Sequence, residues 1–280
     1  MQKISICALA ALGAIALGAP TALAQDPASE PAIEPAAIEA LDKMAAFLNT
    51  LQAFRLTVTM TIDDVIEGGQ VVETAGRAVY EVRRPDRFKV EVITDKAERE
   101  FYYDGATVTQ FSPALGLYSV FQAAPTIAET LDIAEARYDV QLPMTDLFHW
   151  GTDRSGAKVV TSAFAAGESR ISDETCSHYA FRADVTDFQV WIRKRGDPLP
   201  CRVVIVTTDD DARPRYTATF DWDLDPLIGD TVFTFAPPPG TPVKRRLKQR
   251  TPSLSRSRAL RRSLPGPRPH PFRSKSPSPR

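Results

Sequence analysis

The chain has 280 residues, of which 43% are hydrophobic and 25% charged, the composition of a soluble globular protein with enough chain for one large core or two small ones. Its charges are unevenly distributed, because residues 241–280 hold 13 of the 34 basic residues and no acidic ones. Without these and Lys3, residues 25–240 contain 20 basic and 35 acidic residues. The acidic body argues against nucleic-acid binding by the folded part of the chain.

The first 24 residues have the pattern of a secretory signal peptide. Lys3 precedes an apolar run over 4–19, and Ala22-Leu23-Ala24 forms a small-x-small cleavage site before Gln25. The run is shorter than the roughly 20 residues that a membrane span needs, and Cys7 lies too early to be the lipid-carrying residue of a lipoprotein. We therefore expect cleavage after Ala24 and a soluble protein in the periplasm.

A short linker and a helix follow. Residues 25–36 are rich in proline and alanine, which predicts a linker that buries little. Apolar side chains at spacings of three and four then predict an amphipathic helix over 37–52, with a buried stripe formed by Ile38, Leu41, Ala45, Leu48 and Leu51. We expect one folded domain over 37–240.

The hydrophobic period then changes to two. Over 55–63, apolar and polar residues alternate, which predicts a strand with one buried face, and Glu67-Gly68-Gly69-Gln70 is a turn signal after it. The same alternation predicts strands at 71–83, around 88–92, and at 98–103, 107–112, 117–121, 178–183, 187–194, 201–208 and 215–222. The only other helices expected are one at 126–137 and a short turn around 143–149.

This pattern predicts a mainly β (α+β) fold built on one antiparallel sheet of roughly ten strands. A sheet of that size twists and curls, and a few helices can cover the concave side of a half-open barrel. Large aromatic residues are expected on the inward face: Phe88, Phe101, Tyr103, Phe121, Tyr179, Phe181, Phe188, Tyr216, Phe220 and Trp222. Two interpretations stay open, an apolar ligand groove and a filled core without a cavity.

Two cysteines remain in the mature chain, Cys176 and Cys201. The periplasm permits disulfides, but in a simple three-strand meander the outer strands lie about 9.6 Å apart, whereas bridged cysteines need Cα atoms about 4.4 to 6.8 Å apart. A disulfide and two buried thiols are both compatible with the sequence. A metal site is not expected, since His178 is the only nearby classical ligand.

No catalytic arrangement stands out. Residues 155–158 match the S-x-x-K pattern of penicillin-interacting enzymes but read as a glycine-containing loop, and no G-x-S-x-G occurs. The aspartates of 221–225 do not form an EF-hand loop, because Pro226 and Val232 replace its glycine and glutamate. We expect no enzyme activity, no cofactor and no metal.

His149 and His178 are the histidines of the folded body. His178 falls on the strand face opposite Tyr179, where a structural hydrogen bond is favoured over catalysis or metal binding. His149 follows Asp146 by three residues, which fits the end of a short helix. A His–Asp pair without a positioned nucleophile does not make a hydrolase.

A basic cluster, Arg83, Arg84 and Arg87, surrounds Pro85 in the otherwise acidic body. Turn chemistry at a strand boundary is one interpretation of these residues. Binding of an anionic headgroup or partner is the other. The sequence does not separate the two.

Several motifs, in order, resemble a bacterial family of predicted periplasmic proteins of unknown function. They are Arg83-Arg84-Pro85-Asp86-Arg87, Phe101-Tyr102-Tyr103-Asp104-Gly105, Leu142-Pro143-x-x-Asp146-Leu147, Cys176-x-His178-x-Ala180-Phe181-Arg182, Trp191-Ile192, Pro198-Leu199-Pro200 and Phe233-Thr234-Phe235-x-Pro237-Pro238. That family is similar in fold to the lipoprotein carriers and insertion factors of the LolA and LolB type. The resemblance covers about 37–240 and implies an incomplete barrel, covered by helices, whose apolar interior in the carriers accepts acyl chains.

The tail over 241–280 differs from the rest. It holds eight prolines, seven serines and no acidic residue, without apolar periodicity, which predicts disorder. Such a segment can bind anionic lipid or nucleic acid by charge alone. Because the family resemblance stops near Gly240, a reading-frame change is the interpretation we prefer.

These expectations combine into one functional hypothesis. We expect an exported, monomeric, non-enzymatic protein that binds or carries a lipid or lipoprotein acyl chain. The first alternative is an envelope scaffold with a filled core that contacts other proteins. A hydrolase of unknown substrate is a weaker one.

Overall fold

Within residues 33–140, 142–149 and 160–240, which the computed structural model describes, eleven strands form a single antiparallel sheet. The predicted signal peptide, most of the predicted linker, the 155–158 loop and the basic tail lie outside these residues. The strands are β1 (Ala53–Val65), β2 (Val71–Arg83), β3 (Arg87–Thr94), β4 (Glu98–Tyr103), β5 (Thr107–Ser112), β6 (Leu117–Gln122), β7 (Ser162–Ile171), β8 (Glu174–Arg182), β9 (Thr186–Arg193), β10 (Pro200–Thr207) and β11 (Arg215–Asp223).

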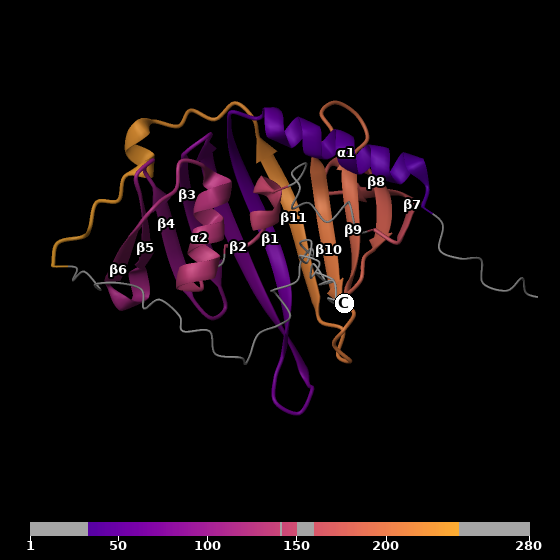
Figure 1. The fold of residues 1–280 in the computed structure, drawn as a ribbon, viewed down its shortest axis with the longest axis horizontal. Coiled ribbons are helices and arrows are strands. Elements are labelled where there is room, and N and C mark those ends of the chain that lie inside the picture. The colour runs from indigo at the N-terminus through magenta and orange to yellow at the C-terminus, as the bar shows by residue number, and fades with distance from the viewer. Residues whose placement is uncertain (1–32, 141, 150–159, 241–280) are drawn as a thin grey trace, which may run out of the picture. The chain divides into compact units, whose positions relative to one another are not determined.

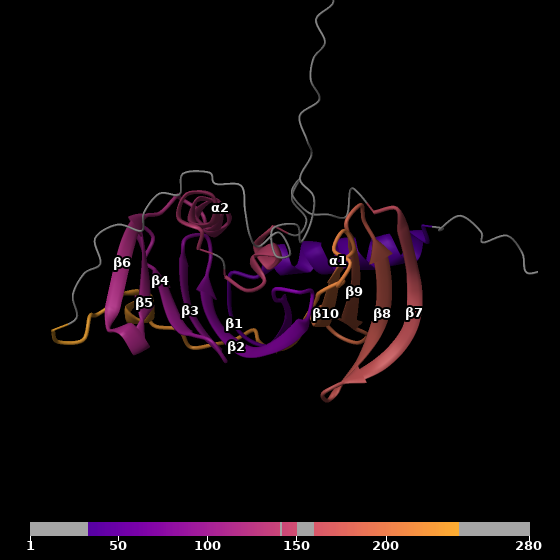
Figure 2. The same ribbon diagram turned by 90° about the horizontal axis from the view of Figure 1, so that it is seen from below.

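The order of the strands in the sheet is β6-β5-β4-β3-β2-β1-β11-β10-β9-β8-β7. Two meanders of consecutive strands are therefore joined where the first strand pairs with the last, with Leu56 opposite Trp222 and Met60 opposite Ala218. Figures 1 and 2 show this junction near the middle of a curved sheet, with β6 and β7 at its two edges. Only this long-range pairing makes one sheet of two local meanders.

Two α-helices of the described residues lie on the concave side. They are α1 (Pro35–Thr50) and α2 (Ile127–Tyr138), accompanied by the short 3-10 helices η1 (Pro113–Leu115), η2 (Thr145–Phe148) and η4 (Asp230–Phe233). In Figures 1 and 2, α2 lies over the face of the β2–β4 region, whereas α1 runs across one end of the strands of the other meander. The two helices thus cover different parts of the face.

Helix α1 begins earlier than the sequence pattern predicts. Pro35 occupies the first turn, where its fixed φ is favourable and its missing N–H costs nothing. The Glu34 amide donates to the Ala163 carbonyl at 2.7 Å, and the Glu34 carboxylate accepts from the Ala165 amide at 3.0 Å. The predicted linker boundary at residue 36 is therefore wrong by a few residues, because this segment is held against the edge of β7.

Helix α2 matches its predicted position closely and has clear end signals. The Thr126 hydroxyl accepts from the Glu129 amide at 3.3 Å, which caps the first turn. At the other end Asp139 adopts a left-handed conformation, with φ of 56°. Its buried residues are Ile127, Thr130, Leu131 and Ala134.

Strand β7 is absent from the sequence-based expectations. Only Ser162 and Ala163 of this strand are buried, so it has no alternating apolar pattern. Its pairing with β8 is also interrupted by a register shift between Ala165 and Gly167. An edge strand with an irregular register gives almost no period-two signal.

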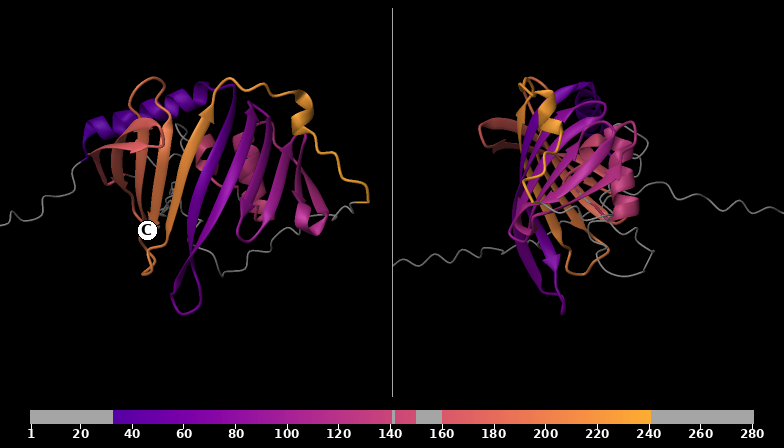
Figure 3. Two further views of the ribbon diagram at one scale, coloured as in Figure 1. Left: turned by 180° about the vertical axis from the view of Figure 1, so that it is seen from behind. Right: turned by 90° about the vertical axis from the view of Figure 1, so that its left-hand side faces the viewer.

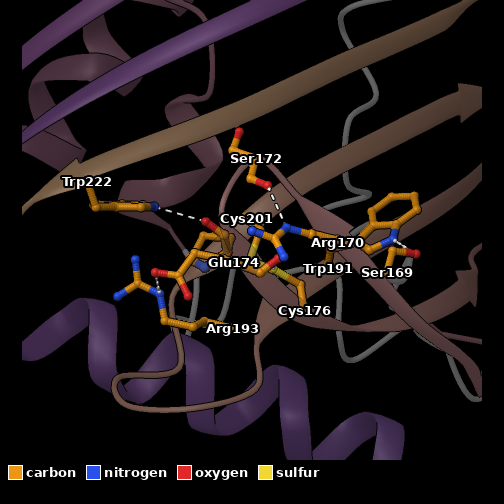
Figure 4. The surroundings of a disulfide bond; sticks show 10 residues. Ser169, Arg170, Ser172, Glu174, Cys176, Trp191, Arg193, Cys201 and Trp222 are labelled. Carbon is orange, nitrogen blue, oxygen red and sulfur yellow. Dashed lines mark hydrogen bonds and ion pairs between the residues drawn. A yellow bond between two sulfur atoms is a disulfide. The ribbon is translucent and has the colours of Figure 1, made fainter.

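A disulfide joins Cys176 on β8 to Cys201 on β10, with the Cα atoms 6.7 Å apart (Figure 4). The separation between outer strands that a flat meander predicts does not apply here. A register shift in the pairing of β9 with β10, between Pro200 and Arg202, falls at Cys201. The bond belongs to a small second core on the side of the sheet away from the helices, formed with Trp191, Val204 and Val206. The two-thiol alternative is thus not what the structure contains.

The segment after β11 crosses to the other half of the molecule (Figures 1 and 3). Phe233 is fully buried, and the Phe235 ring contacts the rings of Tyr102, Phe111 and Tyr118 at centroid distances of 5.0 to 5.2 Å. These partners point to the convex face of β4–β6. The final motif of the domain therefore fastens the chain end to the first meander.

The β1–β2 hairpin extends past its neighbours. Pairing of β1 with β11 ends at Ile62, whereas pairing with β2 continues to Val65. Four aliphatic side chains near the turn are exposed, namely Val65, Ile66, Val71 and Val72.

No helix of the described residues has both the length and the apolarity that crossing a bilayer requires.

Candidate functional site

The strand register places all the predicted inward aromatic residues on the concave face. One row across the sheet runs Phe181, Phe188, Ile205, Tyr216 and Ile62, and another runs Phe54, Val82, Phe88, Tyr103, Val108 and Phe121. The rows show that a common face, predicted from alternation alone, is continuous across both meanders. The cover over it is not uniform.

Beneath α2 the face is a filled core. Phe88, Phe101 and Tyr103 are each at most 2% exposed, and Phe121 is 6% exposed. The Tyr103 hydroxyl donates to the Ala124 carbonyl at 2.6 Å, so its polar end is also satisfied. These four candidates pack as ordinary core residues.

On the other meander part of the face stays accessible. Phe181 and Phe188 stack at 4.8 Å and are buried, and Phe220 is buried at 8% exposure. Their neighbours are only half-buried, and we call this group the open patch: Ile62, Tyr179, Ile205 and Tyr216. Trp222 is half-buried, and its indole donates to the Pro200 carbonyl at 2.9 Å.

A polar group lies beside the open patch. Asp146 of η2 is half-buried, and burial, together with the nearby Glu135 carboxylate, raises the pKa of Asp146 to about 6. The Asp146 charge in turn contributes to the raised pKa of Tyr216, although burial is the larger cause. The Tyr216 hydroxyl donates to the Met60 sulfur at 3.5 Å.

Tyr80 completes this polar group from β2. It is 1% exposed, its hydroxyl donates to the Pro143 carbonyl, and burial raises its pKa well above the usual value. Neither Tyr80 nor Asp146 is among the site residues that the sequence predicts. The Leu142-Pro143-x-x-Asp146 motif was the available signal, but nothing in it showed that η2 would lie against the centre of the sheet.

The structure separates the three arginines of the basic cluster. Arg83 forms an ion pair with Asp230 at 2.5 Å and lies over the Phe233 ring at 5.0 Å. Arg87 donates to the Asp104 carbonyl at 2.5 Å. Arg84 instead lies over the Phe148 ring on the concave side, at 5.6 Å. The predicted cluster is thus not one site, because Arg83 and Arg87 serve local packing.

The histidines have structural partners. His178 stacks on Trp191 at 3.9 Å, and its Nε2 lies 2.9 Å from the Gln189 amide oxygen. His149 lies at the end of η2 as its spacing from Asp146 predicts: its amide donates to the Asp146 carbonyl at 2.9 Å, and its Nε2 lies 3.4 Å from the Asp132 carboxylate. Within the described residues no cluster of three or more His, Cys, Asp or Glu side chains is placed to hold a metal ion.

Comparison with known proteins gives the family. Residues 37–244 match the family model described as a predicted periplasmic protein (DUF2092). The chain belongs to this family. No curated protein matches the sequence. Family membership confirms the resemblance seen in the motifs and the periplasmic location; cleavage after Ala24 stays a prediction.

The chain is also similar to several solved structures. Lipoprotein LppX of Mycobacterium tuberculosis has 15% identity and a TM-score of 0.45, covering 70% of this chain and 98% of that chain. LprF from Mycobacterium bovis has 13% identity and a TM-score of 0.42, covering 72% and 100%. A LolA superfamily protein from Nitrosomonas europaea has 10% identity and a TM-score of 0.32, covering 71% and 97%.

The predicted fold class is confirmed by the sheet itself. It is mainly β, antiparallel and curved, with few helices, and the described residues contain eleven strands where roughly ten are expected. The added strand is β7.

Proposed function

We propose that this periplasmic protein binds the acyl chain of a lipid or lipoprotein against the open patch and carries it without catalysing a reaction. The uneven cover of the concave face is the observation that supports the proposal most. Ile205, Tyr216 and Ile62 are half-buried in the row that begins with the buried Phe181 and Phe188, and Tyr179 is half-buried in the row beside it. In a core closed by the described helices, this row would be as buried as the residues under α2.

The chemistry of the patch suits an alkyl chain. Its side chains are aliphatic or aromatic, and of its two tyrosine hydroxyls that of Tyr216 is already directed at the Met60 sulfur. Burial of each CH₂ contributes about 0.8 kcal/mol, so ten methylenes contribute about 8 kcal/mol before the cost of ordering the chain. That amount is enough for a carrier that must also release its ligand.

The direct test is a lipid extract and mass spectrum of the native protein, followed by titration of the delipidated protein with a fluorescent acyl probe. We expect a co-purifying acyl lipid and saturable probe binding. Ile205→Asp should weaken the probe affinity at least tenfold, because it puts a charge where the chain lies. Ile93→Asp is the matched control, since Ile93 is 53% exposed and lies outside the patch.

Folding is checked by circular dichroism, and Ile205→Met, which keeps the apolar area and changes the shape, serves if the aspartate variant unfolds. A folded Ile205 variant with unchanged probe affinity contradicts the proposed site. No saturable binding by the wild-type protein contradicts the carrier function.

A second candidate function is that of an envelope scaffold. It is favoured by the projecting β1–β2 hairpin, whose exposed Val65, Ile66, Val71 and Val72 make an apolar tip. Absence of acyl lipid, together with specific loss of a partner when Ile66 and Val72 are replaced by serine, would support this role instead.

A further inference from the structure

Arg84 carries a charge that no anion of the described residues balances. It lies in the turn between β2 and β3, half-buried, and its Nε atom is buried without a hydrogen-bond acceptor. Burial lowers the pKa of the guanidinium, and no carboxylate in the described part of the chain acts against that effect. A half-buried arginine without an acceptor is costly, so this side chain calls for a ligand or a structural role.

The turn that bears Arg84 is held firmly. The Arg84 amide donates to the Gln52 carbonyl at 2.8 Å, and the Pro85 carbonyl accepts from the Ile127 amide at 2.9 Å. The end of α1 and the start of α2 thus anchor the backbone on either side. The guanidinium stacks over Phe148, whose ring packs on Phe54 at 6.5 Å, so the side chain lies on the concave side of the sheet.

The neighbouring basic residues do not share this state. Arg83 has Asp230 as its ion-pair partner, and Arg87 donates to Asp104. Arg202 resembles Arg84 in having a buried Nε without an acceptor and in lying over an aromatic ring, that of Trp191 at 5.4 Å. It lies on the opposite face of the sheet, however, and so provides an internal control.

We propose that Arg84 binds the anionic oxygens of an amphiphile, carboxylate or phosphate, whose acyl chain lies against the open patch. The inference rests on the proposed function and adds to it the charge of the ligand and the position of its polar end. A guanidinium offers several N–H donors in a planar fork that matches both oxyanions.

The electrostatics of the concave face favour this orientation. Near the patch, Asp146 is ionised above about pH 6 and Glu135 adds to the negative potential, so an anionic end placed there would be repelled. Element η2 spans the two places: Phe148 contacts Arg84, and the Asp146 charge acts on Tyr216. A ligand with its oxyanion at Arg84 and its chain directed toward Tyr216 balances the Arg84 charge and keeps its own negative charge away from Asp146.

The test compares oleate with oleyl alcohol, which has the same chain and no charge, by calorimetric titration of the full delipidated chain at pH 8. We expect Arg84→Met to weaken oleate binding about tenfold or more and to leave oleyl alcohol binding within about twofold. Arg202→Met should change neither affinity. Arg84→Lys should recover part of the oleate affinity, because it keeps the charge but loses the planar fork.

Lysophosphatidylglycerol as a third ligand distinguishes the two oxyanions: the ligand whose affinity falls more in Arg84→Met identifies the source. Equal loss for oleate and oleyl alcohol in a folded Arg84→Met, or no loss for any anion, overturns the assignment while leaving the acyl-binding function in place. Binding of no ligand by the wild-type protein refutes the proposed function, and this inference with it.

Discussion

The two halves of the concave face carry similar aromatic side chains and differ in how they are covered. On β3–β6, Phe88, Phe101 and Tyr103 lie beneath α2 and are almost completely buried. On β8–β11, α1 crosses one end of the strands, and Tyr179, Ile205 and Tyr216 keep accessible surface. An inward aromatic residue is therefore core or candidate site according to the path of the covering helix, not according to its own pattern.

The largest expected effect tests this comparison by stability. Phe101→Ala should lower the free energy of unfolding by about 3 to 5 kcal/mol, because it leaves a cavity in a filled core. Ile205→Ala should cost only about 1 to 2 kcal/mol, since that side chain is half-buried to begin with. Urea denaturation with a common m-value measures both. Equal losses would break the comparison.

The disulfide probes the half under α1. The bond closes a loop with a sequence separation of 25 residues. In the chain-entropy account such a crosslink stabilises by about 3 kcal/mol, so Cys176→Ser combined with Cys201→Ser should lower the free energy of unfolding by about that amount. Coincident transitions by circular dichroism and tryptophan fluorescence would show that the halves unfold together; separated transitions would show that β7–β10 loosens first.

The pH dependence of stability sharpens the role of Asp146. Its pKa in the folded protein, about 6, lies above its usual value, so the folded protein holds the proton more tightly than the unfolded chain. The resulting stabilisation is complete below about pH 4 and is lost as the pH rises through about 6, with a total of at most about 3 kcal/mol.

Asp146→Asn removes this titration without changing the shape of the side chain. Compared with wild type, the variant should melt at a higher temperature at pH 8 and at about the same temperature at pH 4. If the melting temperatures of wild type and Asp146→Asn differ by the same amount at both pH values, the raised pKa of Asp146 is contradicted.

The smallest effect concerns the strap that ties the chain end to the first meander. Arg83→Gln removes the ion pair with Asp230, whose side chain is 83% exposed, and should cost less than about 1 kcal/mol. Phe235→Ala should cost more, because its ring packs among three aromatic neighbours. Thermal melts of the two variants rank their losses of stability. A greater loss in Arg83→Gln would show that the ion pair, not the aromatic packing, holds the chain end in place.

The sequence alone determined most of the local structure. Alternation of apolar and polar residues is a property of neighbouring positions, so β2, β4 and β5 match their predicted bounds and the inward faces follow directly. Thr126 with Glu129 marks the start of α2 in the same local way. Strand β7 was not predicted, because the alternation of apolar and polar residues depends on one buried face, which most of this edge strand lacks.

The features on which the proposed function depends arise from tertiary contacts. Pairing of β1 with β11 joins residues more than 150 positions apart, and it brings Ile62 beside Tyr216 of the open patch. The register shift at Cys201 allows the disulfide, and the docking of η2 places Asp146 beside Tyr216 and Phe148 under Arg84. These are contacts between segments that are distant in sequence. The local hydrophobic period does not predict which segments meet, because the free energy of burial depends on the apolar area buried and is about the same for any apolar partner.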